Sequence, residues 1–357
     1  MKELKYITND KIYKYDNKHY IQRAHFVNEL SKHFNINYYG YLFKKNKLDL
    51  NKFQIIESSI YLKQISEFNT SRDKNNSLYF MHYPMGFKAL YWGLKLRNNK
   101  CIFWVKGDVL GQYIHNGNFF TKPIRFLTYP IFKLFYDSIS KFIFKNNLIF
   151  YTSNITTNQK NHLNQYEIIS CSEFNRDKKL IKNTLTNKIF FVGGEENRKG
   201  LLLLLKALQH SNKELNIIGL DKLQRKQHQK LAKHVTIKFH GKIYNRKLFF
   251  EKLSRADIVV MPSFGEKQGK VQLEAMSVGA VPICADSGGT YRTIDNYYNG
   301  LLFKEGNWRE LQKQINLLYK DKELYKDLKE NGLEYIKTLS VEKQVEKMAK
   351  IINNYYK

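Results

Sequence analysis

The chain has 357 residues, of which 43% are hydrophobic and 15% aromatic. This length is too great for one ordinary core and predicts two domains, and the hydrophobic content excludes a wholly disordered chain. The formal charge of +28 is spread over both halves and predicts an anionic membrane surface or a phosphate-bearing substrate as partner. No nucleic-acid-binding module accompanies the charge, so nucleic acid is not the expected partner. A lysine-rich, solvated surface is an equally good explanation.

The sequence predicts a cytoplasmic protein. Its cysteines, Cys101, Cys171 and Cys284, match neither a disulfide framework nor a zinc site, which favours a reducing compartment. The N-terminus is polar and has no apolar core of a signal peptide. Charged residues interrupt the most apolar region, 126–150, so the only membrane contact we expect is peripheral attachment to the inner face.

The first half of the chain alternates apolar runs with amphipathic stretches. We expect buried strands at 77–82, 101–105 and 148–151, and helices at 25–34 and 123–144. Such alternation predicts a mainly parallel sheet with helices on both faces.

The stretch 123–145 combines Phe and Tyr with the cations Arg125, Lys133, Lys141 and Lys145. We favour an interpretation in which its apolar face is part of the first domain's core. Adhesion of its lysines to an anionic bilayer is an open alternative.

A second cycle of strands and helices follows a polar stretch after Cys171. We expect strands at 188–192, 215–218, 235–239, 258–261 and 281–285, and helices at 200–208, 246–253, 273–278 and across much of 308–356. The predicted fold is α/β, with a domain over 1–180, a second over 186–340, and a C-terminal helix at 341–357 that packs back on the first domain. Two doubly wound domains in tandem predict a ligand cleft between the carboxyl ends of their strands.

The most informative segment contains Glu266 and Glu274. Glu266 closes a loop after the strand 258–261, and Glu274 lies at the start of the next helix. A carboxylate beside free backbone N–H groups suits a ligand that carries both hydroxyls and a phosphate. Gly269 permits close backbone approach, and Lys270 adds positive charge. A nucleotide sugar has this combination of groups.

Three further turns accompany this segment. Arg198 and Lys199 precede the helix that starts at Gly200 and form a candidate phosphate site, although basic pairs at turns are commonly solvated. The turn 285–289 contains two glycines, and Asn299-Gly300 is a plain turn signal.

In this order and spacing, the four elements resemble the retaining glycosyltransferases of family 4, which have the two-domain GT-B fold. The resemblance covers residues 186–338 well and the first half in outline. Its most specific part is the pair of glutamates with seven residues between them.

The resemblance implies a role for each matching residue. Glu274 corresponds to the glutamate that binds the nucleotide ribose, and Glu266 to the one that faces the donor sugar. Lys199 corresponds to the lysine that neutralises the leaving diphosphate. Arg198 lies beside it and compensates for Gly194, which stands where the family usually has an arginine.

Backbone groups complete the implied donor site. Those of Gly269, Lys270 and Val271 would lie near the sugar and phosphates. The segment 241–243, which ends at Ile243, falls where the family holds the base. Side chains at Lys267 and Gln268 replace a common Gly-Phe pair and are expected to change donor preference.

The acceptor side is less well marked. The family often has a histidine after a strand that faces the cleft, and here that strand runs into Lys106, Gly107 and Asp108. His82 follows the preceding strand and is a third candidate, although a lone histidine at a strand end is more often structural.

The resemblance implies a metal-independent, retaining enzyme without a cofactor, which uses a UDP- or GDP-linked sugar as substrate. No Asp-x-Asp motif that would hold a metal is present. We expect the acceptor to be a growing glycan, lipid-linked, in the synthesis of a surface polysaccharide such as lipopolysaccharide or capsule. The alternatives are another GT-B activity, such as a sugar phosphorylase, and a non-catalytic protein that binds membrane or nucleic acid.

Overall fold

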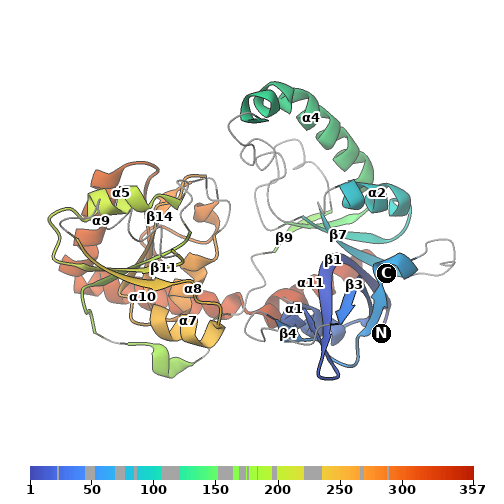
Figure 1. The fold of residues 1–357 in the computed structure, drawn as a ribbon, viewed down its shortest axis with the longest axis horizontal. Coiled ribbons are helices and arrows are strands. Elements are labelled where there is room, and N and C mark those ends of the chain that lie inside the picture. The colour runs from blue at the N-terminus through green and yellow to red at the C-terminus, as the bar shows by residue number, and fades with distance from the viewer. Residues whose placement is uncertain are drawn as a thin grey trace. The chain divides into compact units, whose positions relative to one another are not determined.

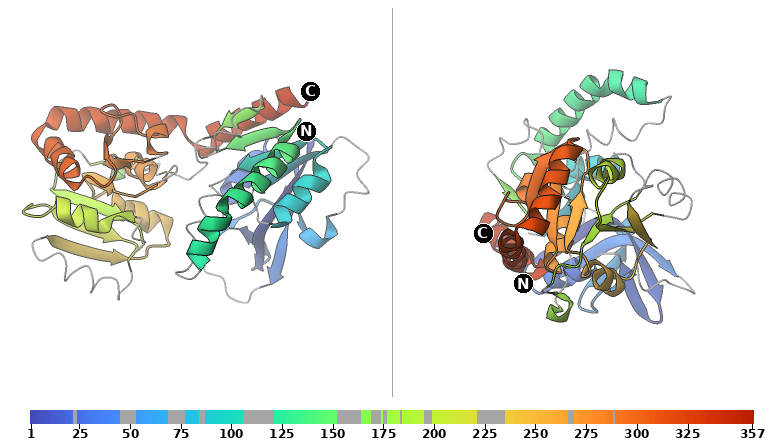
Figure 2. Two further views of the ribbon diagram at one scale, coloured as in Figure 1. Left: turned by 90° about the horizontal axis from the view of Figure 1, so that it is seen from above. Right: turned by 90° about the vertical axis from the view of Figure 1, so that its left-hand side faces the viewer.

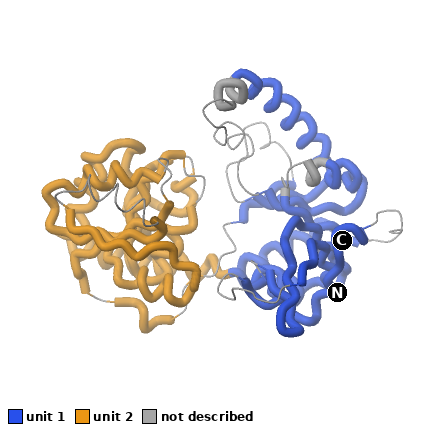
Figure 3. The backbone as a smooth tube through the Cα atoms, viewed as in Figure 1, with its two compact units in different colours: residues 1–171, 341–357 blue, residues 172–340 orange. Residues whose placement is uncertain are grey.

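The computed structural model describes residues 1–21, 24–44, 53–68, 77–83, 87–105, 121–151, 164–168, 174, 177–182, 184–194, 199–220, 235–265, 269–287 and 289–357. The chain forms two compact units (Figure 3). Unit 1 contains residues 1–171 and 341–357, and unit 2 contains residues 172–340. The C-terminal segment is therefore part of the same compact unit as the N-terminal half.

Unit 1 is built on one large sheet (Figure 1). Its strands are β1 (Glu3–Tyr15), β2 (Lys18–Ile21), β3 (Asn35–Lys44), β4 (Gln54–Ile55), β5 (Tyr61–Gln64), β6 (Leu78–Tyr83), β7 (Cys101–Val105), β8 (Leu148–Tyr151) and β9 (Gln165–Glu167). Its helices are α1 (Ala24–Ser31), α2 (Phe87–Leu96), α4 (Thr121–Phe144) and α11 (Val341–Tyr355), with a 3-10 turn at Ile65–Glu67.

The parallel part of this sheet has the order β5-β3-β1-β6-β7-β8-β9, and β2 and β4 extend it with antiparallel pairs beside β1. The chain enters at β1, moves outward through β3 to β5, and then returns to β6 on the other side. The order thus reverses between β1 and β6, which is where a doubly wound sheet binds ligands.

Successive side chains of a strand point to opposite faces, and this alternation divides the core of unit 1 in two. Tyr6 and Phe80 lie in the cluster that packs against α1 and α11. Tyr79 and Phe103 lie in the other cluster, which packs against α2 and α4. Figure 2 shows α2 and α4 together over one face of this sheet.

The expectation that the apolar face of the helix 123–144 is core is correct for one side of α4 only. Tyr136, Ile143 and Phe144 are buried against the sheet. A second row of large apolar side chains is exposed, which corrects the sequence interpretation: Leu127, Ile131, Leu134, Phe135 and Phe142. The helix is apolar on two sides, whereas the sequence interpretation considered a single apolar face.

Unit 2 contains a wholly parallel sheet of six strands with the order β12-β11-β10-β13-β14-β15. The strands are β10 (Lys188–Val192), β11 (Glu214–Ile218), β12 (Thr236–Gly241), β13 (Ile258–Met261), β14 (Val281–Asp286) and β15 (Leu301–Lys304). The helices are α5 (Leu201–Ala207), α7 (Arg246–Leu253), α8 (Val271–Ser277), α9 (Trp308–Lys320) and α10 (Lys322–Thr338), with 3-10 turns at Lys178–Leu180 and Thr290–Arg292. The strand order reverses between β10 and β13.

Helices cover both faces of the second sheet. Alternate residues of its strands pack against α5 and α9 on one face and against α7 and α8 on the other. Both units are therefore doubly wound α/β structures, as the alternating apolar runs predicted.

A buried carboxylate fixes the chain where it enters unit 2. Asp257 is fully buried and accepts hydrogen bonds from the Lys182 ammonium at 2.5 Å and from the backbone N–H of Lys188 at 2.8 Å. The Tyr319 hydroxyl donates to the same carboxylate at 3.2 Å. Burial lowers the pKa of Lys182, and the neighbouring Asp257 opposes this effect. These bonds join the amino end of β10 to that of β13.

The tail 308–356, which the sequence predicted to be helical, forms three helices. Asp321 ends α9 and caps α10 by accepting a hydrogen bond from the backbone N–H of Leu324 at 2.9 Å. Val345 and Ile352 of α11 are buried in the core of unit 1. Among the helices within the described ranges, none is long and apolar enough to cross a membrane.

Candidate functional site

Three turns pack together at the carboxyl edge of the sheet in unit 2. The backbone N–H of Gly193, after β10, donates to the carbonyl oxygen of Ile218 at 3.0 Å. The backbone N–H of Gly219, after β11, donates to the carbonyl oxygen of Gly241 at 2.8 Å. Gly219 has a φ of +118°, and a Cβ atom there would lie 2.3 Å from the Gly193 carbonyl oxygen. Glycine is thus required where the turns after β10 and β11 meet.

The reversal of strand order brings Lys199 beside the turn after β13. Gly200, which follows Lys199, has a φ of +71°, and a Cβ atom there would lie 2.0 Å from the Pro262 carbonyl oxygen. The Cγ atom of Lys199 lies 3.5 Å from where a Cβ atom of Gly193 would be. The stem of Lys199 therefore lies over the turn after β10, at the point in the fold where ligands bind.

The segment between β13 and α8 is attached to its neighbours at both ends. The backbone N–H of Gly265 donates to the Glu305 carboxylate, after β15, at 2.9 Å. Gly269 has a φ of +64°, and its missing Cβ leaves space for the buried Gln272 side chain. The Gln272 amide donates to the Thr293 hydroxyl, in the segment after β14, at 2.9 Å. The loops after β13, β14 and β15 are therefore held together.

Glu274 lies in the first turn of α8 and is only 7% exposed. The Arg246 guanidinium, at the start of α7, donates to its Oε1 atom at 2.8 Å. Asn245 caps α7 by accepting from the Leu248 backbone N–H at 3.0 Å, which sets where Arg246 stands. The guanidinium also lies over the Phe250 ring, 4.6 Å from its centroid.

The electrostatics of Glu274 combine two opposing effects. Burial raises the pKa of its carboxyl, and Arg246, with a smaller contribution from Lys270, lowers it. A carboxylate accepts up to about four hydrogen bonds, so the one from Arg246 leaves capacity for ligand hydroxyls. The arrangement can therefore hold a neutral hydroxyl-bearing group next to a cation.

The structure brings most predicted donor-site residues to this edge. Gly269 and Lys270 lead into α8, Val271 is the first residue of that helix, and Gly194 follows β10. Ile243, after β12, packs on the same apolar cluster as Val271. Arg198 and Glu266 lie outside the described residues, as do Lys267 and Gln268, and so do Lys106 and Asp108 on the acceptor side.

His82, the third acceptor-side candidate, lies at the end of β6, beside the reversal of strand order in unit 1. Its Nε2 atom lies 2.6 Å from the Tyr6 hydroxyl, and its ring makes an edge contact with Trp104. Nearby, the Tyr38 hydroxyl donates to Asp10 at 2.8 Å, and burial raises the pKa of Tyr38. Tyr6 stacks on Tyr38, so the two hydrogen-bonded pairs adjoin.

Sequence reasoning missed Arg246, Tyr6 and Asp10. Arg246 is one basic residue among many. It lies 28 positions before Glu274 in the sequence, and only the fold brings the two side chains together. Asn245 was a usable sign of a helix start, but no local pattern indicates the pairing. Tyr6 and Asp10 lie in a polar stretch that was not assigned to a strand.

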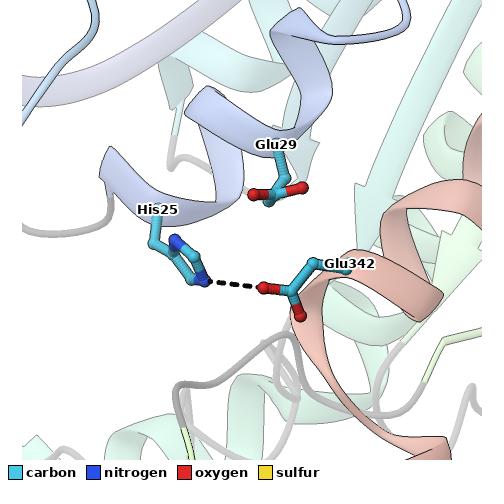
Figure 4. Close-up of side chains that lie close together, drawn as sticks. All are labelled: His25, Glu29 and Glu342. Atoms are coloured by element: carbon cyan, nitrogen blue, oxygen red, sulfur yellow. Dashed lines mark ion pairs between the residues drawn. The ribbon is translucent and has the colours of Figure 1, made fainter.

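Unit 1 also contains the one group of three possible metal ligands found among the described parts of the chain (Figure 4). His25 and Glu29 lie one turn apart on α1, and Glu342 lies in the first turn of α11. His25 Nε2 lies 3.5 Å from a Glu342 oxygen, while the Lys32 ammonium donates to Glu29 at 2.6 Å. Because Lys32 already neutralises Glu29, we assign the cluster to the packing of α11 on α1.

Residues 172–335 match the family model described as glycosyl transferases group 1. An uncharacterised glycosyltransferase of Methanocaldococcus jannaschii is 32% identical over 164 residues, which are 45% of this chain and 46% of the relative. The match thus spans about half the length of that relative. An N,N'-diacetylbacillosaminyl-diphospho-undecaprenol alpha-1,3-N-acetylgalactosaminyltransferase of Campylobacter jejuni is 31% identical over 108 residues, 29% of each chain.

The fold is also found in solved structures. Anabaena HepE in complex with UDP superposes with a TM-score of 0.67 at 13% identity, over 99% of this chain and 100% of that one. The same protein in complex with UDP-glucose gives a TM-score of 0.65. At this identity the likeness shows the fold, which is GT-B, and so confirms the predicted fold class. Residues 172–335, nearly all of unit 2, are thus similar to the glycosyl transferases group 1 family, and the family resemblance seen in the sequence is confirmed for this segment.

Proposed function

We propose that this chain transfers a sugar from a UDP- or GDP-linked donor to a growing, lipid-linked glycan, with retention at the anomeric carbon. The single observation that carries the proposal is the pair of Glu274 and Arg246 at the reversal of strand order in unit 2. A carboxylate this well buried is rarely kept without use, since its burial costs free energy. As the acceptor for two ribose hydroxyls, it gives a nucleotide both affinity and orientation.

Lys199 supplies the charge that the leaving group needs. When the bond from the anomeric carbon to the diphosphate breaks, negative charge develops on the leaving oxygen, and a preplaced cation stabilises that transition state. The constrained glycine after Lys199 sets the direction of its backbone. By the family resemblance, Arg198 assists Lys199, and Glu266 faces the donor sugar.

Retention would follow if the acceptor attacks the face that the diphosphate leaves. The leaving oxygen then takes the acceptor proton, so bond breaking and proton transfer occur on one side of the sugar. No carboxylate across the scissile bond is needed, in contrast to a glycosidase. Glu266 and Glu274 then act on different parts of the donor.

We propose that the reaction is metal-independent, with lysine and arginine in the place of a divalent cation. A chelator is expected to leave the rate unchanged. A loss of activity on chelation, restored by added Mg²⁺ or Mn²⁺, would contradict this part of the proposal.

The proposed acceptor is a lipid-linked glycan at the inner face of the cell membrane, in the synthesis of a surface polysaccharide such as lipopolysaccharide or capsule. Two observations support it. The Campylobacter jejuni relative is named for an acceptor that carries diphospho-undecaprenol. The excess of positive charge also favours contact with an anionic surface.

Release of free nucleoside diphosphate from a donor, in the presence of a membrane extract, tests the proposal. We expect Lys199→Ala to lower turnover roughly 10²-fold, as loss of a transition-state contact does. Lys206→Ala, an exposed lysine on the adjoining helix α5, is the control and should not change it. Release of sugar 1-phosphate instead would favour a phosphorylase, and no release with any donor would favour a non-catalytic protein.

A further inference from the structure

The exposed apolar side chains of α4 form a stripe along one side of the helix, interrupted by the exposed Ser138, and we call it the α4 stripe. It comprises Leu127, Ile131, Leu134, Phe135 and Phe142, whose exposed fractions are 77%, 73%, 72%, 55% and 53%. These positions recur at the spacing of one helical face over about four turns. Scattered exposed apolar residues are normal, but five large apolar side chains exposed on one helical face indicate a binding surface.

The opposite side of α4 fixes the orientation of the stripe. Tyr136, Ile143 and Phe144 are buried against the sheet of unit 1, with Phe132 and Ile139 partly buried beside them. Because the helix cannot roll without exposing this core, the stripe stays directed away from the sheet.

Cations border the stripe. No acidic side chain is exposed on the described part of α4. Lys141 and Lys145 are exposed next to Phe142, and the guanidinium of Arg97 lies 4.9 Å from the centroid of that ring. The one acidic residue of α4, Asp137, is buried. The neighbouring helix α2 adds exposed Tyr91, with the Lys95 ammonium 5.7 Å from the centroid of its ring.

We infer that the α4 stripe inserts into an anionic lipid bilayer at the level of the headgroups, with its bordering cations on the lipid phosphates. An apolar face flanked by Lys and Arg is the physical pattern of a helix that lies in the interface plane. A second copy of this chain is a poorer occupant, because two chains of formal charge +28 repel each other. The use of this surface, to present a lipid-linked acceptor to the enzyme, rests on the proposed function.

Flotation of the full chain with lipid vesicles tests the inference. We expect binding to vesicles of equimolar phosphatidylcholine and phosphatidylglycerol, and weak binding to phosphatidylcholine alone. The triple variant Leu127→Gln, Ile131→Gln, Leu134→Gln should lower the partition coefficient at least about tenfold, because it removes apolar insertion. Its fold should be retained, since all three side chains are largely exposed. The control, Leu202→Gln with Leu248→Gln, changes two exposed leucines of unit 2 and should float as the unchanged chain does.

Three results would overturn the inference. They are no flotation on anionic vesicles, flotation of the triple variant equal to that of the unchanged chain, and evidence that the α4 stripe mediates only self-association. Sedimentation velocity detects the last, as a concentration-dependent dimer of the unchanged chain that the triple variant abolishes. A thermal-shift measurement with UDP and GDP separates this inference from the proposed function. A chain that binds vesicles but no nucleotide would contradict the proposed transfer and leave the membrane surface standing.

Discussion

The Arg246 guanidinium donates a hydrogen bond of 2.8 Å to the carboxylate of Glu274, and this contact joins the first turns of α7 and α8. The glutamate is buried, while the arginine side chain is 41% exposed. If the contact breaks, the Arg246 guanidinium can be solvated by water, but the Glu274 carboxylate stays buried without its partner.

Arg246→Ala is expected to lower the free energy of unfolding by about 1–3 kcal/mol, the cost of leaving a buried acceptor unsatisfied. It should also weaken nucleotide binding, because Glu274 loses the partner that orients it. Lys247→Ala, an exposed neighbour on the same helix, should change neither quantity. Chemical denaturation measures the stability, and the double variant with Glu274→Gln should recover part of the loss.

Stability should depend on pH through Glu274. Because burial raises the pKa of Glu274 above its ordinary value of 4.5, the folded state binds this proton more tightly than the unfolded state. The free energy of unfolding of the unchanged chain, relative to Glu274→Gln, should therefore fall as pH rises from about 4.5 through the raised pKa. Below pH 4.5 the difference in the free energy of unfolding between the unchanged chain and Glu274→Gln should be constant. A difference that grows with pH would mean that Arg246 outweighs burial.

Gly200→Ala should destabilise unit 2 by at least about 2 kcal/mol, because alanine disfavours the left-handed conformation and its Cβ would meet the Pro262 carbonyl. Gly194→Ala is the matched comparison, since among the described residues, its chain neighbours apart, no atom lies within 4 Å of the added Cβ. It should leave the melting temperature nearly unchanged. Lower nucleotide affinity in this stable variant would support the donor-site role of Gly194.

On the acceptor side, Tyr6→Phe removes the hydroxyl that lies 2.6 Å from His82. If His82 acts on the acceptor, we expect kcat/KM for the acceptor to fall roughly five- to tenfold, the effect of one lost hydrogen bond. Donor affinity should stay the same and is the internal control. An unchanged kcat/KM in both Tyr6→Phe and His82→Ala would leave the pair a purely structural role.

The sequence predicted the second unit better than the first. Strands such as 258–261 and 281–285 are apolar without interruption, as strands buried on both faces are, and glycines follow several of them. The long strand β1 was not assigned, because Lys, Asn and Asp interrupt its apolar residues and a register shift lies between Ile7 and Lys11. β3 was also not assigned, although most of its residues are apolar or aromatic; Asn35, Asn37 and Gly40 interrupt them.

The candidate site was predictable where it depends on local order along the chain. Lys199, Gly269 and Glu274 all follow strands, and parallel strands carry such residues to one edge. The contact with Arg246 depends on how α7 packs beside α8, and long-range packing of this kind leaves no periodic trace in a sequence. The exposed apolar side of α4 was not predicted, because periodicity shows that a face is apolar without showing what covers it.

Isothermal titration with UDP and with GDP tests the central claim most directly, since Glu274 is proposed to bind the ribose that both share. The unchanged chain should bind at least one of them, and Glu274→Ala should weaken that binding at least about tenfold, as loss of hydrogen bonds to a charged acceptor does. Glu323→Ala, which changes an exposed glutamate in the first turn of α10, should bind as the unchanged chain does. Equal affinity in a folded Glu274→Ala variant would contradict the assignment of the donor site.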